Sequence, residues 1–155
     1  MSEVPLFTPF KIKSKTLRNR IVLSPMCQYK ALDGFINEWH LQHYSRFAFS
    51  GLGAAFIEAT GVSSEGRIGH GCTGIWDDNH IEGLSKIVKT FKEYNCLSGI
   101  QLAHAGRKAS FLRPWDGASP ITKEDGNEPA WQTIGPSAIP INDSSPIPKE
   151  MTIND

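Results

Sequence analysis

The chain has 155 residues, the length of a single domain, and its apolar (39%) and charged (21%) fractions are ordinary for a folded globular protein. Lys plus Arg and Asp plus Glu both number 16, so there is no net charge to attract nucleic acid or an anionic membrane surface. No apolar run approaches the roughly 20 residues that a membrane span needs, and the first ten residues lack the pattern of a signal peptide, so we expect a cytoplasmic location.

The first predicted elements are a hairpin, a strand and a helix. Residues 6–11 and 15–19 form two short extended runs with a polar turn between them. Residues 20–26 form an apolar, β-branched strand that ends at Pro25, which cannot donate to a sheet ladder. Asn37 can cap a helix whose apolar residues follow helical spacing as far as Gly51.

A second strand and helix follow. Residues 54–57 are apolar throughout, as expected of a strand covered on both faces, and polar residues follow them. After a glycine-rich loop, Asn79 is the predicted cap of the second helix, with Glu82 at capping-box spacing.

Residues 97–102 form the third predicted strand. Residues 107–149 hold seven of the ten prolines and show no periodicity, so they predict a long irregular excursion beside a functional site. Residues 152–155 resemble the first turn of another helix.

Alternating strands and helices predict a parallel sheet, either doubly wound or closed into a (β/α)8 barrel. A doubly wound nucleotide-binding sheet would carry a glycine-rich turn after its first strand, and residues 24–28 contain no glycine. A barrel places its chemistry at the carboxyl ends of its strands, and six polar residues fall at those positions. They are Ser24, Cys27, Glu58, Thr60, Gln101 and His104. The barrel is therefore the favoured α/β fold.

Several motifs in order give the chain a family resemblance. They are residues 24–29 (SPMCQY), 39–44 (WHLQHY), 58–60 (EAT), 66–68 (GRI), 74–77 (GIWD) and 101–108 (QLAHAGRK). The chain resembles the Old Yellow Enzyme family of FMN-dependent NADPH dehydrogenases and ene-reductases. Cys27 is similar to the residue found in the thermophilic-like branch of the family, whereas the plant and brewer's-yeast branch carries threonine at this position.

The resemblance implies that residues 1–155 are the N-terminal portion of one NADH:flavin oxidoreductase TIM-barrel domain, with an N-terminal β-hairpin, about three strands of eight and an incomplete barrel. It implies FMN as cofactor, NADPH or NADH as reductant, and a small activated alkene such as an enone or enoate as substrate. Hydride would pass through flavin N5 in a ping-pong reaction. The full-length family member is expected to be a homo-oligomer that binds neither nucleic acid nor membrane.

The resemblance also assigns roles to single residues. Those implied to bind the cofactor are Ser24, Pro25, Met26, Cys27, Ala59 and Gln101. The Cys27 thiol would tune the flavin, and the Gln101 amide matches the donors and acceptors of its pyrimidine edge. Tyr29 would bind a substrate carbonyl, and it and Cys27 are the catalytic candidates. The alternatives are a small core cysteine, a loop glutamine and an ordinary tyrosine.

His40 and His43 resemble the H-x-x-H pair with which the family binds substrate. In the family, however, that pair follows the fourth strand, and these two residues lie on the first predicted helix. They share a helix face, but no third residue completes a metal site, so a structural role is favoured. The three cysteines show no C-x-x-C spacing either, and no metal site is predicted.

Two other functions remain open. The chain could be a truncated, catalytically inactive remnant, or an interaction partner of a full-length relative. It could also be the flavin part of an enzyme like dienoyl-CoA reductase. The cysteine ligands of the iron–sulfur cluster of such an enzyme would lie outside these residues. A reading frame that continues into a second H-x-x-H motif would favour the ene-reductase.

Overall fold

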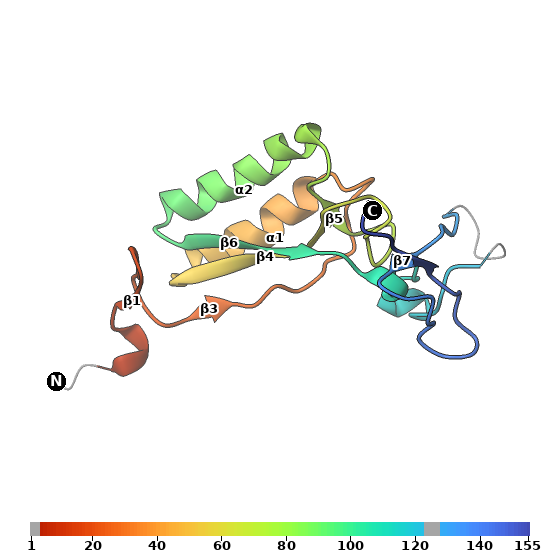
Figure 1. Ribbon diagram of the computed structural model, residues 1–155. Coiled ribbons are helices and arrows are strands. Elements are labelled where there is room, and N and C mark those ends of the chain that lie inside the picture. Colours follow the sequence, from red (N-terminus) through yellow and green to blue (C-terminus); the bar gives the residue numbers. More distant parts are fainter. Residues whose placement is uncertain (1–3, 123–127) are drawn as a thin grey trace.

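A computed structural model describes residues 4–122 and 128–155. Its centre is a parallel sheet of β3 (Val22–Leu23), β4 (Ala54–Gly61) and β6 (Leu97–Ala103), with β4 in the middle. Helices α1 (Glu38–Phe49) and α2 (Ile81–Glu93) connect these strands and lie together on one face of the sheet (Figure 1). The order confirms the predicted succession of right-handed β/α units.

Helix α1 begins where the sequence predicts. The Asn37 side chain accepts a hydrogen bond from the Trp39 N–H (3.1 Å), and His40 Nδ1 accepts one from the Asn37 N–H (3.3 Å). Together these bonds form a capping box, although histidine takes the place of the usual glutamate. The helix ends at Phe49 with Ser50 as its C-cap, and Gly51 follows with φ +88°, a left-handed conformation that glycine adopts without strain.

The predicted cap of α2 is wrong. Asp77, not Asn79, supplies the capping oxygen, which accepts the Asn79 N–H at 2.8 Å. A 3-10 turn, Asp78–His80, then leads into the helix. Glu82 makes no capping box and pairs with Lys86 one turn later (2.8 Å). The sequence predicted the helix but placed the capping residue two positions too late.

The hydrophobic core lies between the sheet and the two helices. Its buried residues are Leu23, Tyr44, Ala48, Ala55, Ile57, Leu84, Ile87, Phe91 and Cys96. Phe91 and Ile87 are almost completely buried, and burial of each such side chain contributes about 1.5–3 kcal/mol. The stability of both helices therefore depends on their packing against this face of the sheet.

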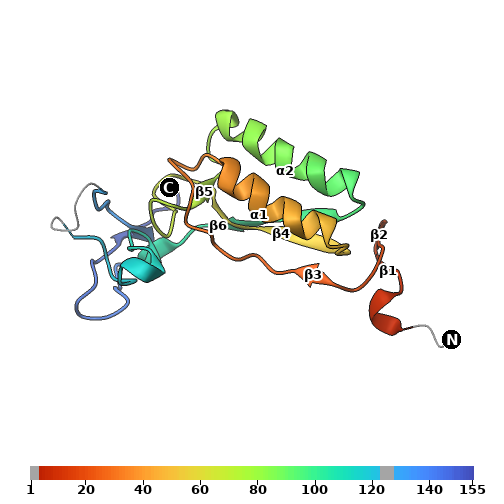
Figure 2. The ribbon, with the colours of Figure 1, turned by 180° about the vertical axis from the view of Figure 1, so that it is seen from behind.

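The N-terminal segment is shorter in extended structure than predicted. Residues Pro5–Phe7 form a 3-10 turn, and the hairpin consists of β1 (Phe10–Ile12) and β2 (Lys15–Leu17). The predicted strand over residues 20–26 is reduced to β3, since only Val22 and Leu23 pair with β4. Figure 2 shows the hairpin beyond the amino ends of the strands.

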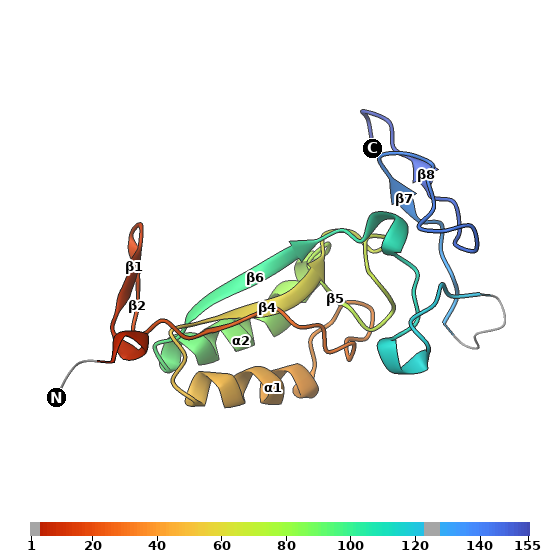
Figure 3. The same cartoon turned by 90° about the horizontal axis from the view of Figure 1, so that it is seen from below.

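The excursion lies at the opposite end of the sheet, beyond the carboxyl ends of the strands (Figure 3). Before it, β5 (Thr73–Gly74) pairs with the end of β4. Within it, 3-10 turns Gly106–Lys108 and Pro114–Asp116 are followed by β7 (Ile134–Gly135), which pairs with β8 (Lys149–Glu150). Residues 152–155 form a turn closed by the Asp155 side chain, so the predicted helix start there is wrong.

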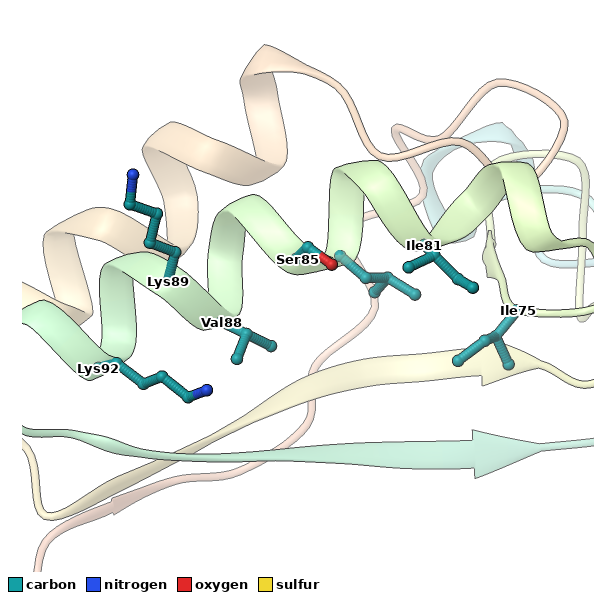
Figure 4. Close-up of a pocket in the computed structure, with 7 residues that line it drawn as sticks. Ile75, Ile81, Ser85, Val88, Lys89 and Lys92 are labelled. Carbon is teal, nitrogen blue, oxygen red and sulfur yellow. The ribbon is translucent and has the colours of Figure 1, made fainter.

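The other face of the sheet carries no helix among the described residues. Side chains that would point into a barrel are exposed there, including Val22 (45%) and Phe56 (40%). An open groove also runs along α2 (Figure 4), lined by Ile75, Ile81, Leu84, Ser85, Val88, Lys89 and Lys92.

The parallel strands with helices on one face form the N-terminal part of a (β/α)8 barrel fold, with the barrel not closed. None of the described helices is both long and apolar enough to cross a membrane.

Candidate functional site

A β-bulge in β4 determines which side chains reach the helix-free face. The β4–β6 register shifts between Ile57 and Ala59, so Ile57 pairs with Ile100 and Ala59 pairs with Gln101. Ile57 and Glu58 are therefore both buried on the helix side, at 1% and 0% exposure. Ala59 then lies beside Gln101 at the carboxyl ends of two adjacent strands.

Gln101 and Ala59 together form a small polar platform. Gln101 is exposed, and within the described residues its amide makes no hydrogen bond. The amide can therefore offer both a donor and an acceptor to a planar ligand. Ala59 is half-buried and its methyl group leaves space above the sheet.

Cys27 lies next to this platform. Its sulfur accepts a hydrogen bond from the backbone N–H of Ala59 and interacts with the Tyr29 hydroxyl. Burial, with smaller contributions from Cys72 and Glu58, raises the pKa of the Cys27 thiol to about 11. At neutral pH it is a protonated thiol, suited to tune a neighbouring group and poorly suited to attack one.

Tyr29 is held by contacts from several segments. Its φ is +53°, its carbonyl oxygen accepts from Arg113 Nε (3.3 Å), and its ring meets the Trp115 ring edge-on with centroids 5.9 Å apart. Burial first, and then Cys27, raise the pKa of Tyr29 to about 12. The phenol therefore remains protonated at neutral pH and can donate a hydrogen bond.

The three residues before Cys27 form the segment that leads out of β3. Ser24 and Met26 are exposed and Pro25 is half-buried. The Met26 carbonyl accepts a hydrogen bond from the Gln28 side chain at 2.9 Å. The structure thus brings Cys27 into contact with Ala59 and with Tyr29, and places Gln101 beside Ala59. Residues 24–26 lead from β3 to this group.

Glu58 is the functional candidate that the sequence analysis did not assign. Its carboxylate accepts the Gln28 N–H and lies 3.4 Å from the Tyr44 hydroxyl and 3.5 Å from His40 Nε2. Burial raises the pKa of Glu58 to about 7, although hydrogen bonds from Gln28, Tyr44 and Tyr29 oppose the shift. The available signal was an acidic residue directly after an apolar strand, but the bulge that buries it cannot be read from the sequence.

His40 and His43 both lie on α1, but in different environments. His40 is fully buried, and burial, with His43 as a lesser cause, lowers its pKa to about 4. The His43 ring packs edge-on against Tyr44 and Phe47. Among the described residues, no group of three His, Cys, Asp or Glu side chains is placed to hold a metal ion.

His104 follows β6, and its Nδ1 accepts the Gly106 N–H at 3.1 Å. That bond closes the turn that leads into the excursion. His104 therefore has a local structural task at the edge of the site.

The residues present fit the pyrimidine side of the expected FMN. This ring edge alternates carbonyl oxygens with an N–H, which a single carboxamide such as that of Gln101 can match. A flat ring over Ala59 would meet the Ala59 methyl group and the neighbouring Cys27 thiol. The fit concerns the ring; the phosphate group has no assigned partner among these residues.

Comparison with known proteins identifies the family to which the chain is similar. Residues 5–155 match the family described as NADH:flavin oxidoreductase / NADH oxidase. The chain is 46% identical over 149 residues to an NADPH dehydrogenase of Geobacillus thermodenitrificans, covering 95% of this chain and 38% of the relative. It is 42% identical over 157 residues to an NADPH dehydrogenase of Bacillus licheniformis, covering 100% of this chain and 41% of the relative. The chain thus spans about two fifths of the length of these curated relatives.

Solved structures give the same result for the fold. The old yellow enzyme from Trypanosoma cruzi superposes with a TM-score of 0.75 at 28% identity, over 97% of this chain and 43% of that one. Morphinone reductase superposes with a TM-score of 0.77 at 21% identity, over 99% of this chain and 41% of that one. The second likeness concerns the fold alone. These matches confirm the predicted resemblance.

Proposed function

Since the chain belongs to the NADH:flavin oxidoreductase / NADH oxidase family, we propose that it contributes the pyrimidine side of the flavin site to an FMN-dependent NAD(P)H oxidoreductase that reduces activated C=C bonds. Residues 1–155 would form the N-terminal portion of one TIM-barrel domain in that enzyme. The partners would be NADPH or NADH and a small enone or enoate.

One observation carries this proposal. The β4 bulge places Ala59 beside Gln101 on the helix-free face, and the Ala59 N–H donates to the Cys27 sulfur. The ends of β4 and β6 and the segment after β3 thereby bring together a small residue, a carboxamide and a protonated thiol. These groups can contact the ring of a flavin and form hydrogen bonds to its edge.

Each residue has a distinct task in the proposed reaction. When bound, FMN supplies the hydride carrier between NAD(P)H and the alkene. Gln101 would hold the ring edge by two hydrogen bonds, and Cys27 would donate a weak hydrogen bond that adjusts the electron affinity of the ring. Tyr29, a protonated phenol beside Cys27, would donate to the substrate carbonyl and stabilise the negative charge that develops there.

The test uses the protein in the full length that its gene encodes, called the full-length protein below. We expect it to purify with FMN and to oxidise NADPH or NADH in the presence of cyclohexenone. An unrelated flavin reductase with free FMN controls for non-specific transfer to oxygen. A full-length protein that binds no flavin would contradict the proposal, whereas one that binds FMN but reduces no enone would limit it to the flavin site.

The reading frame beyond codon 155 gives an independent test. The family resemblance implies that an H-x-x-H pair and the phosphate-binding loops lie outside residues 1–155. We expect the continuing frame, or a separate gene beside it, to encode both. A genome that encodes neither would favour the alternative of an inactive remnant.

A further inference from the structure

We propose that Glu58 is a positioning residue whose buried carboxylate holds residues 27–29, here called the 27–29 loop, in the conformation that presents the Cys27 thiol and the Tyr29 phenol to the strand ends. This inference rests on the proposed function, because it names the residue that orders the proposed site. No contact between Glu58 and a ligand is required. Glu58 lies on the helix-covered side of the sheet and acts through its hydrogen bonds to the backbone of the loop.

The first step of the argument is the backbone of the loop. The Gln28 N–H donates to Glu58 Oε2 at 2.5 Å, and the Tyr29 N–H also donates to this carboxylate. Tyr29 has φ +53°, a conformation that residues other than glycine rarely adopt. A non-glycine residue stays in this region only when surrounding contacts hold it there. Two N–H groups bonded to one fixed carboxylate supply such contacts.

The second step is the fixation of the carboxylate itself. The Glu58 N–H donates to the Tyr44 hydroxyl at 2.8 Å, and that hydroxyl lies 3.4 Å from Oε1. His40 Nε2 lies 3.5 Å from Oε1. One oxygen thus faces α1 and the other faces the loop. The β4 bulge aims the side chain into this position.

The third step separates positioning from simple packing. A fully buried carboxylate is costly unless hydrogen bonds satisfy it, and an apolar side chain would fill the same space at lower cost. The carboxylate nevertheless accepts hydrogen bonds from the 27–29 loop, the segment that carries both catalytic candidates. Its removal should therefore affect the loop more than the core.

The experiment compares three variants of the full-length protein. Glu58→Met keeps the volume but removes both acceptors, and Glu58→Gln keeps one oxygen that can face the loop. Glu82→Met is the control, because Glu82 is exposed on α2, far along the chain from the loop, and pairs with Lys86. The first readout is the rate of Cys27 alkylation by iodoacetamide in FMN-free protein, followed by peptide mass spectrometry. The second is FMN affinity by fluorescence titration.

We expect Glu58→Met to raise the alkylation rate at Cys27 at least fivefold and to weaken FMN binding at least tenfold, with Cys96 alkylation unchanged. Glu58→Gln should restore both values to within about twofold of the wild type, and Glu82→Met should match the wild type. A folded Glu58→Met variant with wild-type alkylation and FMN affinity would overturn the proposal. Equal defects in the Met and Gln variants would also overturn it.

A variant that loses its fold does not end the test. Should Glu58→Met unfold, Glu58→Asp addresses the same contact, because its carboxylate is one methylene too short to reach the Gln28 N–H. Faster Cys27 alkylation is then expected, and an unchanged rate would refute the proposal. The alkylation assay needs no flavin, so a wild-type protein that binds no FMN would refute the proposed function while leaving the role of Glu58 measurable.

Discussion

Gln101 is the residue on which the flavin hypothesis depends most directly, because its exposed amide is the only carboxamide at the described carboxyl ends of β4 and β6. Gln101→Leu removes both hydrogen bonds to the ring edge, each with a net contribution of about 0.5–1.5 kcal/mol. FMN affinity of the full-length protein should fall roughly tenfold or more. Flavin fluorescence titration measures this change. Gln42→Leu, at an exposed position on α1, should leave the affinity unchanged, and an unaltered Gln101→Leu variant would remove Gln101 from the site.

Cys27 should change the midpoint potential of the flavin without being required for its reduction by NADPH. Burial keeps the thiol protonated, so Cys27→Ala removes a weak donor and not a nucleophile. We expect a shifted midpoint potential, measured spectroelectrochemically, with reduction by NADPH still detectable. Cys96→Ala, which alters a buried thiol of the core, should leave the potential in place. Complete loss of reduction in a flavin-loaded Cys27→Ala protein would instead make Cys27 a direct participant.

His40 and Glu58 should have opposite effects on the pH dependence of stability. Folding lowers the pKa of His40 from 6.5 to about 4, so its contribution to stability decreases as the pH falls through that range. Folding raises the pKa of Glu58 from 4.5 to about 7, so its contribution decreases as the pH rises through that range. Between about pH 4.5 and 6.5 the two effects cancel, because the folded and unfolded states bind equal numbers of protons at this pair.

Single substitutions should expose each effect. Relative to the wild type, Glu58→Gln should lose stability as the pH is lowered from about 6.5 to 4.5, by up to about 1 kcal/mol per pH unit. His40→Gln should lose stability as the pH is raised over the same range. Thermal unfolding of the full-length proteins at three pH values measures both slopes. Parallel profiles for the three proteins would show that the pair is not coupled to folding.

Among single residues, the sequence predicted those whose position follows from the strand ends. Ala59 and Gln101 belong to this group, since parallel strands bring their carboxyl ends to one edge. The burial of Glu58 could not be predicted, because the bulge places two consecutive side chains on one face and breaks the period of two. The Arg113 contact to Tyr29 spans 84 residues and depends on the irregular excursion, which has no periodic signal.

At the scale of the elements, the packing of two loops at the site can be tested with one methyl group. A Cβ on Gly71 would overlap the Tyr29 carbonyl, and the Gly71 carbonyl also accepts the Ala31 N–H at 3.0 Å. Gly71→Ala should therefore displace the 27–29 loop, destabilise the protein by about 1–3 kcal/mol and weaken FMN binding. Urea unfolding and flavin titration measure the two effects.

Gly135→Ala is the matched control for this prediction. Gly135 lies on β7, and a Cβ there would have no neighbour closer than 3.8 Å, which is an ordinary contact. The same added methyl group should be neutral or slightly stabilising there, because it restricts the unfolded chain. Equal effects of the two substitutions would show that the two loops can move apart at no cost.

The helices and strands were predicted well where the apolar residues show a strong periodicity. Their exact ends were predicted poorly, because several residues near each end are suitable as caps or strand residues. Both helices were found, since their apolar residues repeat at helical spacing and pack on one face. The start of α2 was misplaced because Asp77 and Asn79 are both good caps, and only tertiary packing selects Asp77. Residues 20–26 were predicted as a strand, but only Val22 and Leu23 pair in register with β4.

At the scale of the whole molecule, the helix-free face is the dominant feature. Val22, Phe56 and Leu97 are all at least 36% exposed, and they lie side by side across the three strands. Within the described residues, β3 and β6 each pair on one side only. Closing a barrel of this kind takes about eight strands, which would cover both edges and bury this face.

A polypeptide of residues 1–155 alone should therefore be neither a stable monomer nor an active reductase. Open strand edges beside an apolar face pair with other chains, so we expect aggregation or rescue by a fragment that supplies the remaining barrel units. Size-exclusion chromatography with light scattering, with and without that fragment, measures the first outcome. A cyclohexenone-dependent NADPH assay measures the second. A monomer of 155 residues that purifies yellow and reduces cyclohexenone would contradict the prediction, and would show that three β/α units with their loops are sufficient to bind and use FMN.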